Sequence, residues 1–251
     1  MFLETVVGSR AEGLAAKVAA TDIRNLKIWW ADSMDSPWCP ATEPSLREAL
    51  HAARLHLEHT FRVITCKFQW PVDMANSAVI WATKLAFESK GKPPLASDLK
   101  NREGTANMMK EWLLCMCGLS EHTFATIRLI STLPNPRCKK FNEPQLNWKN
   151  VQKQFMDILG KDSVLLVPVH SMTACYHKEP LFYSMKGAEY CYIFNATEMP
   201  GTTVPLGLSK DGLPLALQVV TTPENDHLSL AVAAALEEKF GGWVSPSPIK
   251  V

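Results

Sequence analysis

Three histidines and two cysteines are the side chains of this sequence whose types and spacing first suggest metal chemistry. His51, His56 and His59 fall in one predicted helix, and Cys115 and Cys117 fall in another. His51 and His56 would point about 140° apart on a helix, whereas zinc-binding pairs favour i, i+4 spacing. The cysteines have no second Cys or His pair at zinc spacing. We therefore expect no metal and no other cofactor, with the histidines on a solvated helix face and the cysteines as small buried apolar residues.

Two further positions could carry chemistry. His170 follows a strand-like run, the place where α/β proteins often put functional groups, and it would act as a base only beside an activated nucleophile. We expect a loop or pocket-wall histidine. Asn195, Ala196 and Thr197 form a glycosylation acceptor sequence, but that modification needs a secreted, exposed setting. A structural role is the favoured interpretation.

The elements that position these residues begin with a strand, a helix and a second strand. Residues 26–31 (LKIWWA) and 62–67 (RVITCK) read as short strands, and a helix starts near Thr42 with Pro44 in its first turn. This unit favours a parallel pair and the α/β class. No glycine-rich phosphate loop follows Ala31, so a nucleotide-binding domain is disfavoured.

The rest of the chain alternates helices with strands. Helical patterns cover residues 71–89, 108–133 with a break at Gly118, 145–159, 187–198 and 224–240, and strand patterns cover 163–167, 202–206 and 215–221, the last two separated by a turn at 209–212. We expect a mixed β-sheet flanked by helices.

Composition limits the partners and the compartment. The chain has 251 residues, and Lys plus Arg (26) nearly balance Asp plus Glu (25), so no long-range field recruits nucleic acid. Seven cysteines at irregular spacing predict a reducing, intracellular compartment, and residues 1–13 lack the pattern of a signal peptide. The longest apolar run, residues 112–119, is too short for a transmembrane helix, which needs roughly 20 residues.

Three motifs in series resemble one enzyme family. They are the buried run 164–168 that ends in proline, the stretch from Asn195 through Met199-Pro200-Gly201 to Val204-Pro205-Leu206-Gly207, and Asp211-Gly212-Leu213-Pro214 before a strand that contains Gln218. In this order and spacing they are similar to the C-terminal part of the amidase-signature serine hydrolases, and within these to the fatty-acid amide hydrolases. Glu198 departs from the family, which more often has Gly there, and Thr202 and Thr203 replace smaller or aliphatic residues.

The resemblance implies hydrolysis of amides or esters by a serine nucleophile, a second serine and a lysine base, all held near a Gly-Ser-rich loop in an N-terminal segment. No Gly-Gly-Ser-Ser sequence occurs here, and the only Gly-Ser pair is Gly8-Ser9. We therefore expect residues 1–251 to be the C-terminal part of one amidase-signature domain, a fragment without catalytic residues that is inactive alone. A lipid amide is the expected substrate of the complete enzyme.

The resemblance also implies two surfaces. Residues 190–195 correspond to a helix on the acyl side of the family's active site, so Cys191, Phe194 and Asn195 are the candidate substrate-binding residues; the alternative is a core helix ended by Asn195. Residues 108–133 take the place of an apolar helical cap that meets the membrane, with core packing as the alternative. The sequence leaves open a homodimer, and also a non-catalytic lipid-binding or interaction protein derived from this fold.

Overall fold

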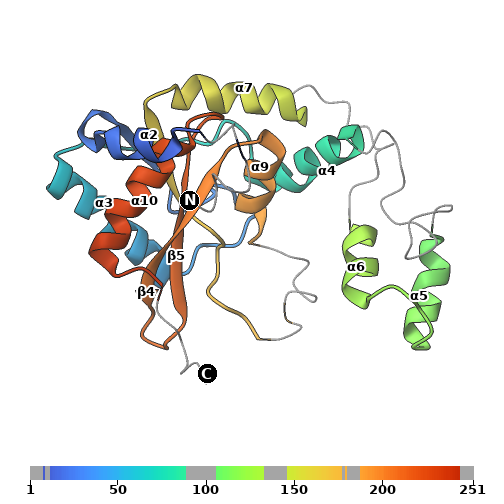
Figure 1. Cartoon of the computed structure of the whole chain (residues 1–251). Helices are drawn as coiled ribbons and strands as arrows, with labels where there is room; N and C mark the ends of the chain where they lie inside the picture. The colour runs from blue at the N-terminus through green and yellow to red at the C-terminus, as the bar shows by residue number, and fades with distance from the viewer. Residues whose placement is uncertain are drawn as a thin grey trace.

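The computed structural model describes residues 8, 12–88, 106–132, 146–176, 179 and 187–243. These residues form a five-stranded mixed sheet in the order β2-β1-β3-β5-β4, with helices on both of its faces (Figure 1). The predicted fold class, a mixed β-sheet flanked by helices, is confirmed.

The predicted strand, helix, strand unit is present and parallel. β1 (Lys27–Trp30) and β2 (Thr65–Lys67) pair in parallel, with Ile28 opposite Thr65. α3 (Pro44–Phe61) connects them and has its proline in the first turn, where the missing N–H costs nothing. The helix ends at Phe61, and Arg62 caps it with a left-handed φ of 56°.

The other three strands complete the sheet. β3 (Ser163–Pro168) is buried along its whole length and runs parallel to β1. β5 (Pro214–Val220) is antiparallel to β3 and forms a hairpin with β4 (Gly201–Leu208). Gly212 adopts a φ of 77° in the predicted turn between them, a conformation that glycine reaches without strain.

The remaining helices agree with most of the predicted ranges. They are α2 (Leu14–Ala20), the 3-10 turns η2 (Ile23–Asn25) and η3 (Met74–Asn76), α4 (Ser77–Glu88), α5 (Met108–Met116), α6 (Phe124–Thr132), α7 (Trp148–Leu159), α9 (Glu189–Thr197) and α10 (Asp226–Phe240). Among the described helices, only α2 and η2 lack a counterpart in the sequence analysis. α2 has seven residues, none of them buried, so it carries no hydrophobic periodicity to detect. Ser89, Leu133 and Gln145, at the ends of predicted helices, lie outside the described residues.

Each face of the sheet carries its own apolar core. Ile28, Val164 and Leu166 point to one face and pack with buried side chains of α3 and α10. Leu165 and Val167 point to the other face and pack with buried side chains of α7 and α9. Because successive strand residues alternate between faces, one buried strand, β3, contributes to both cores.

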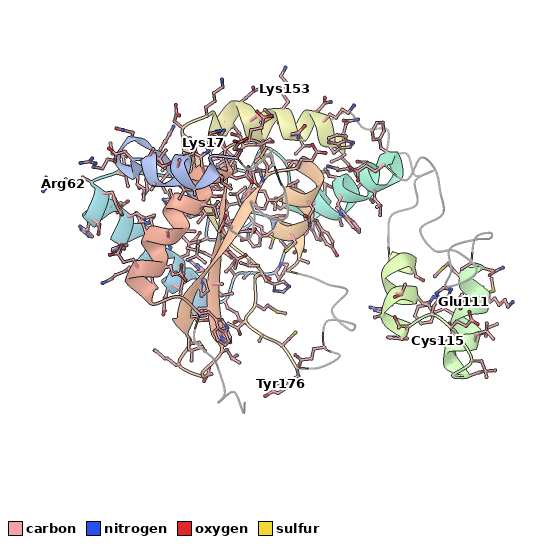
Figure 2. The ribbon with its side chains drawn as sticks, in the orientation of Figure 1. Lys17, Arg62, Glu111, Cys115, Lys153 and Tyr176 are labelled. Atoms are coloured by element: carbon pink, nitrogen blue, oxygen red, sulfur yellow. The ribbon has the colours of Figure 1, made fainter. Side chains whose placement is uncertain are left out.

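α5 and α6 form a helical pair that lies apart from the sheet (Figure 1). The two helices pack on each other, with Trp112 against Phe124 at 5.6 Å between ring centroids and Trp112 Nε1 donating to Oγ of Ser131. The expectation of buried cysteines is wrong here, because Cys115, labelled in Figure 2, is half-buried and Cys117 is exposed. A two-helix pair has too little interior to cover both.

Candidate functional site

Polar side chains gather where β3 ends and where α3 and α9 begin. The loop after β3 accepts a backbone hydrogen bond at Ser171 from the N–H of Glu43, the residue before α3 (2.8 Å). Thr173 in the same loop also contacts Glu43, because its backbone N–H and its Oγ1 both donate to Oε2 of Glu43, at 3.0 and 2.8 Å. The carboxyl end of a strand and the start of a helix are thereby fixed against each other, at the edge of the sheet where α/β proteins bind ligands.

His170 is held in this loop by a hydrogen bond at one of its ring nitrogens. Its Nδ1 accepts a hydrogen bond from the backbone N–H of Met172 at 3.1 Å. In a neutral ring with Nδ1 as acceptor, the proton lies on Nε2, which is then a donor. The placement agrees with the predicted loop histidine.

Ser171 is the most buried hydroxyl among the described residues of the loop. Its side chain is fully buried, and within the described ranges its Oγ has no hydrogen-bond partner. Gly187 lies against it: a Cβ at this glycine would be 2.5 Å from Ser171 Oγ and would also clash with Cε1 of His170. Gly187 has a φ of 100° as well, so both the backbone and the space require glycine.

The three predicted substrate-binding residues lie in different environments on α9. Cys191 is half-buried, and its Sγ donates to the carbonyl of Val169 at 3.6 Å. Phe194 is buried in the core, 5.9 Å from Phe155 between ring centroids. Asn195 is exposed, and the helix continues to Thr197, so Asn195 does not end it. Cys191 and Asn195 share one face of α9, because they are four residues apart.

Burial raises the pKa of the Cys191 thiol. The protonated thiol is the form that donates to a carbonyl, so this cysteine is a structural group and a poor nucleophile.

Tyr190 anchors α9 beneath this edge, a role that sequence analysis missed. Its ring is fully buried, and its hydroxyl shares a hydrogen bond of 3.3 Å with Oγ1 of Thr42. Burial raises the pKa of Tyr190, more than the bond to Thr42 lowers it. The two residues are 148 positions apart, so no local pattern joins them.

The expected solvated face of histidines is wrong for His51. Its Nε2 is 3.0 Å from Oδ2 of Asp32, a buried residue two positions after β1, and its ring lies edge-on to Trp30 at 5.0 Å between centroids. Burial raises the pKa of Asp32, but the His51 hydrogen bond and the charge of Arg47 outweigh it and lower the pKa overall. His51 therefore turns toward the carboxylate of Asp32, a contact that the spacing of residues along the helix does not reveal.

The other two histidines remain on the outer side of α3. His56 packs its ring against Phe240 at 6.3 Å between centroids and accepts or donates a hydrogen bond with Thr60. Burial, together with the charge of Lys239, lowers the pKa of His56. His59 is exposed. Across the described ranges no group of three or more His, Cys, Asp or Glu residues is placed to hold a metal ion.

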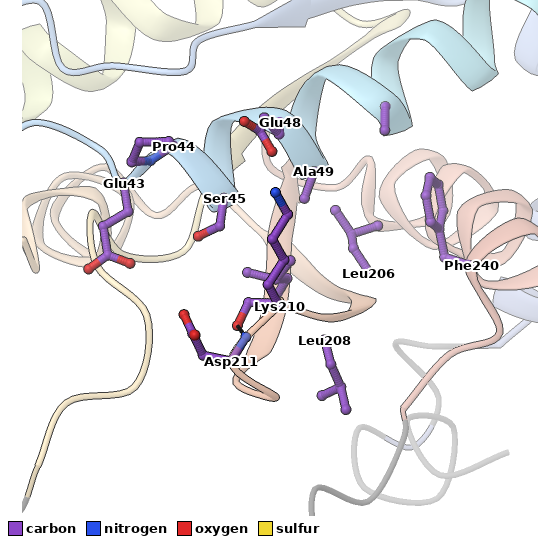
Figure 3. A pocket seen from close by; sticks show the side chains of 13 residues that line it. Glu43, Pro44, Ser45, Glu48, Ala49, Leu206, Leu208, Lys210, Asp211 and Phe240 are labelled. Atoms are coloured by element: carbon purple, nitrogen blue, oxygen red, sulfur yellow. Dashed lines mark hydrogen bonds between the residues drawn. The ribbon is translucent and has the colours of Figure 1, made fainter.

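Two hollows open beside the polar edge. One, of about 600 Å³, lies between α3 and the β4–β5 hairpin and has the apolar side chains Leu206, Leu215 and Phe240 on its wall. Figure 3 shows Lys210 extending from the hairpin toward Glu48 of α3 across this space. The second, of about 500 Å³, lies between the loops that follow β1 and β2.

Sequence comparison finds similarity to fatty-acid amide hydrolases. It is 36% identical to zebrafish (Danio rerio) fatty-acid amide hydrolase 2-B over 252 residues, which cover 99% of this chain, and 43% identical to human (Homo sapiens) fatty-acid amide hydrolase 2 over 180 residues, which cover 69% of it. This chain is an amidase-signature protein similar to fatty-acid amide hydrolase 2. A scan against family models gave no match.

Solved structures support the same fold for this amidase-signature protein. A bacterial aryl acylamidase of the amidase-signature family superposes with a TM-score of 0.60 at 15% identity, over 90% of this chain and 45% of the other. A solved fatty acid amide hydrolase gives 0.52 at 14% identity, over 88% and 41%. The chain spans between a third and a half of the length of these relatives, 47% of the zebrafish protein and 33% of the human one.

One departure from the family pattern has a structural explanation. Glu198 follows α9 with a φ of 55°, the left-handed conformation for which the glycine usual in the family is suited. Its Oε1 lies 2.5 Å from Nζ of the buried Lys84 on α4, and its Oε2 accepts from Gln152 on α7 at 3.3 Å. These bonds connect three helices of one core and offset the backbone strain.

Proposed function

We propose that this chain is the C-terminal part of an amidase-signature hydrolase that acts on fatty-acid amides or esters, and that it is inactive alone. In the complete enzyme it contributes part of the central sheet and one wall of the acyl pocket. The similarity to fatty-acid amide hydrolases over nearly the whole chain supports the substrate class.

The environments of the serine, histidine and cysteine at the polar edge support the proposal that the chain is inactive alone. Hydrolysis by a serine requires a base that removes the hydroxyl proton. The fully buried Ser171 has no hydrogen-bond partner in the described part of the chain, and His170 already uses Nδ1 as an acceptor. Cys191 donates its proton to a carbonyl. The hydroxyl of Ser171, the imidazole of His170 and the thiol of Cys191 are therefore each held in a structural environment, and we expect none of them to be activated for catalysis.

Fluorophosphonate labelling of the purified chain tests inactivity. Human fatty-acid amide hydrolase 2 serves as the positive control, and Ser171→Ala is the matched variant. We expect the chain and the variant to give the same background signal. Labelling of the chain that disappears in Ser171→Ala would show an activated serine and contradict the proposal.

Cys191 and Asn195 form the proposed pocket wall, with Phe194 supporting it from the core side. The two outer residues share one face of α9, next to the loop that carries His170. In a fusion of this chain behind the part of the zebrafish relative that it does not cover, Cys191→Trp should raise KM for a long-chain amide. The control is Lys153→Trp, because Lys153, labelled in Figure 2, is an exposed residue of α7. Equal KM values for the two variants would refute the proposal that Cys191 lines the pocket.

Exposed apolar side chains on the α5–α6 pair support contact with a membrane surface. Met109, Leu113 and Met116 follow helical spacing along α5, and with Leu119 and Phe124 they are between 43% and 81% exposed. Such a patch matches an interfacial helix, although few basic residues flank it. None of the described helices is long and apolar enough to cross a bilayer.

Vesicle sedimentation tests this contact. The chain should bind neutral phosphatidylcholine vesicles, because the patch is apolar and weakly charged. Leu113→Glu with Met116→Glu should reduce binding at least about tenfold, since each change loses the transfer of a large apolar side chain, which is worth about 1.5–3 kcal/mol when burial is complete. The pair Lys110→Glu and Lys149→Glu changes the net charge twice as much and should have a smaller effect. Unchanged binding of the apolar variants would refute the membrane role.

The alternative function is a non-catalytic lipid-binding or interaction protein. Both faces of the described sheet are already covered by helices, which favours a chain that folds alone. Size-exclusion chromatography and circular dichroism distinguish the two proposals. A monodisperse, cooperatively folded chain supports the alternative, and aggregation supports the incomplete hydrolase, because exposed strand edges and apolar surface promote association.

A further inference from the structure

The hollow of about 600 Å³ between α3 and the β4–β5 hairpin lies outside the candidate site. None of the described residues that line it is a candidate substrate-binding residue, and neither His170 nor Ser171 lines it. Its buried lining residues, Leu206 and Leu215, belong to the core beneath α3 and α10, whereas Phe194 of α9 belongs to the core on the other face of the sheet. The sheet therefore separates this hollow, which we call the α3–hairpin groove, from the proposed acyl pocket.

Short side chains on α3 leave room for the groove. Ser45, Ala49 and Ala52 line it and lie on one side of α3, because they are four and three residues apart. The hairpin contributes Leu208, a large apolar side chain that is 40% exposed, and Phe240 of α10 lies at one end (Figure 3). The groove thus offers an alkyl chain an apolar wall that is open to solvent.

Carboxylates outnumber cations around the groove. Among the described residues that line it, Glu43, Glu48 and Asp211 are acidic and Lys210 is the one basic residue. Glu43 already accepts two hydrogen bonds from Thr173, whereas Glu48 and Asp211 are exposed. The N-terminal end of α3 offsets only about half of one negative charge. The remaining excess of negative charge favours a cation and disfavours a carboxylate or a phosphate in this space.

The side chain of Lys210 has the chemistry that the groove accommodates. It consists of four methylene groups and an ammonium, and it extends from the hairpin across the groove toward Glu48 (Figure 3). A free alkylammonium ion carries the same two groups. Because Lys210 is exposed, its ammonium stays in water when the side chain leaves the groove, so its displacement costs little.

We propose that the α3–hairpin groove binds a cationic amphiphile, an alkylamine whose ammonium takes the place of the Lys210 ammonium near Glu48. The alkyl chain then lies on Leu208 and Phe240. The volume of the groove is within the range of about 300–1,000 Å³ that is usual for small-molecule sites. This inference goes beyond the proposed function and does not depend on it, because the groove needs no serine nucleophile.

Isothermal titration calorimetry of the full chain with n-octylamine tests the site, at concentrations below those at which the amine forms micelles. Octanoate should bind at least about tenfold more weakly than octylamine, because its charge has the wrong sign. Butylamine should also bind at least about tenfold more weakly, because four CH₂ groups no longer contact the apolar wall. Octanoate that binds as tightly as octylamine would overturn the proposal, and so would butylamine.

Removal of the carboxylates tests the position of the ammonium. The double variant Glu48→Gln with Asp211→Asn should weaken octylamine binding about tenfold, the combined effect of two exposed charge pairs. Glu224→Gln with Asp162→Asn makes the same two changes at exposed residues that do not line the groove, and it should leave the affinity unchanged. Equal losses in the two double variants would show that only the net charge of the chain attracts the amine.

Removal of the lysine should have the opposite effect. Lys210→Ala deletes the side chain that competes with the ligand, so octylamine should bind about threefold more tightly or better. Lys153→Ala, at an exposed residue of α7, is the matched control and should have no effect. Unchanged or weaker binding in Lys210→Ala contradicts the displacement of this side chain.

Circular dichroism of each variant shows whether it is folded. If the chain aggregates alone, the same titrations use the fusion with the part of the zebrafish relative that the chain does not cover, since the lining residues all belong to this chain. Fluorophosphonate labelling of that fusion reports on the hydrolase separately. Octylamine binding without labelling supports the groove and not the proposed function, and labelling without octylamine binding does the reverse.

Discussion

Replacement of Glu198 separates backbone strain from ion pairing at one residue. A non-glycine residue in the left-handed region costs about 1 kcal/mol relative to glycine. The bond to buried Lys84 is charge-assisted, but Glu198 is half exposed, so we expect it to contribute about 1–2 kcal/mol. Glu198→Ala loses the bond and keeps the strain, whereas Glu198→Gly loses both. The alanine variant should therefore be about 1 kcal/mol less stable than the glycine variant.

Urea unfolding followed by circular dichroism measures this difference, provided that the m value stays constant. Glu224, an exposed residue with a φ of 69°, provides the control, because Glu224→Ala keeps the same strain and should change stability by less than about 0.5 kcal/mol. A glycine variant no more stable than the alanine variant would refute the account of strain. In the double variant with Lys84→Met, additive losses would refute the coupling between the two side chains.

The same pair gives a pH dependence. The hydrogen bond from Lys84 lowers the pKa of Glu198, with a smaller contribution from Gln152. A carboxyl group whose pKa is lower in the folded state stabilises the fold above its unfolded value, and this contribution is lost as the pH falls through the folded value. Wild-type stability should therefore fall more than that of Glu198→Gln as the pH drops below about 4.

Two further predictions concern the polar edge and the cysteines. Gly187→Ala should destabilise the chain by about 2 kcal/mol or more, because backbone strain and a clash with His170 combine. Gly212→Ala, with open space around the residue, should cost about 1 kcal/mol. Equal losses of stability in urea unfolding would refute the contribution of the clash. Burial, with the charge of Glu189, raises the pKa of Cys39 to about 11. At pH 8 iodoacetamide should therefore modify exposed Cys117 well before Cys39, as mass spectrometry would show, and faster reaction at Cys39 would contradict its burial.

Periodicity and turn chemistry were sufficient to predict most elements of this fold. The turn residues 209–212 separated the two strands that form the β4–β5 hairpin, and the helix expected to start near Thr42, with Pro44 in its first turn, is α3. The strand order was not predictable, because the place of β5 between β3 and β4 depends on contacts between distant segments. α2 escaped detection because it buries nothing.

The site was less accessible from sequence than the fold. Helical spacing placed His51 on a face but could not reveal that Asp32, at the end of another strand, meets it there. The Thr42–Tyr190 bond joins residues 148 positions apart. The resemblance located α9 correctly but could not distinguish buried Phe194 from exposed Asn195, because that difference depends on how the helix sits on the sheet.

The separation of the α5–α6 pair from the sheet has a thermodynamic consequence. Inside the pair, buried Glu111 accepts a hydrogen bond from Ser120 at 2.7 Å, and His122 is buried beside them, so the interior is small and partly polar. Opening this pair breaks few apolar contacts and none within either core of the sheet. It should behave as a separate unit of low local stability, whose amides exchange by local opening while those of β3 exchange only on global unfolding.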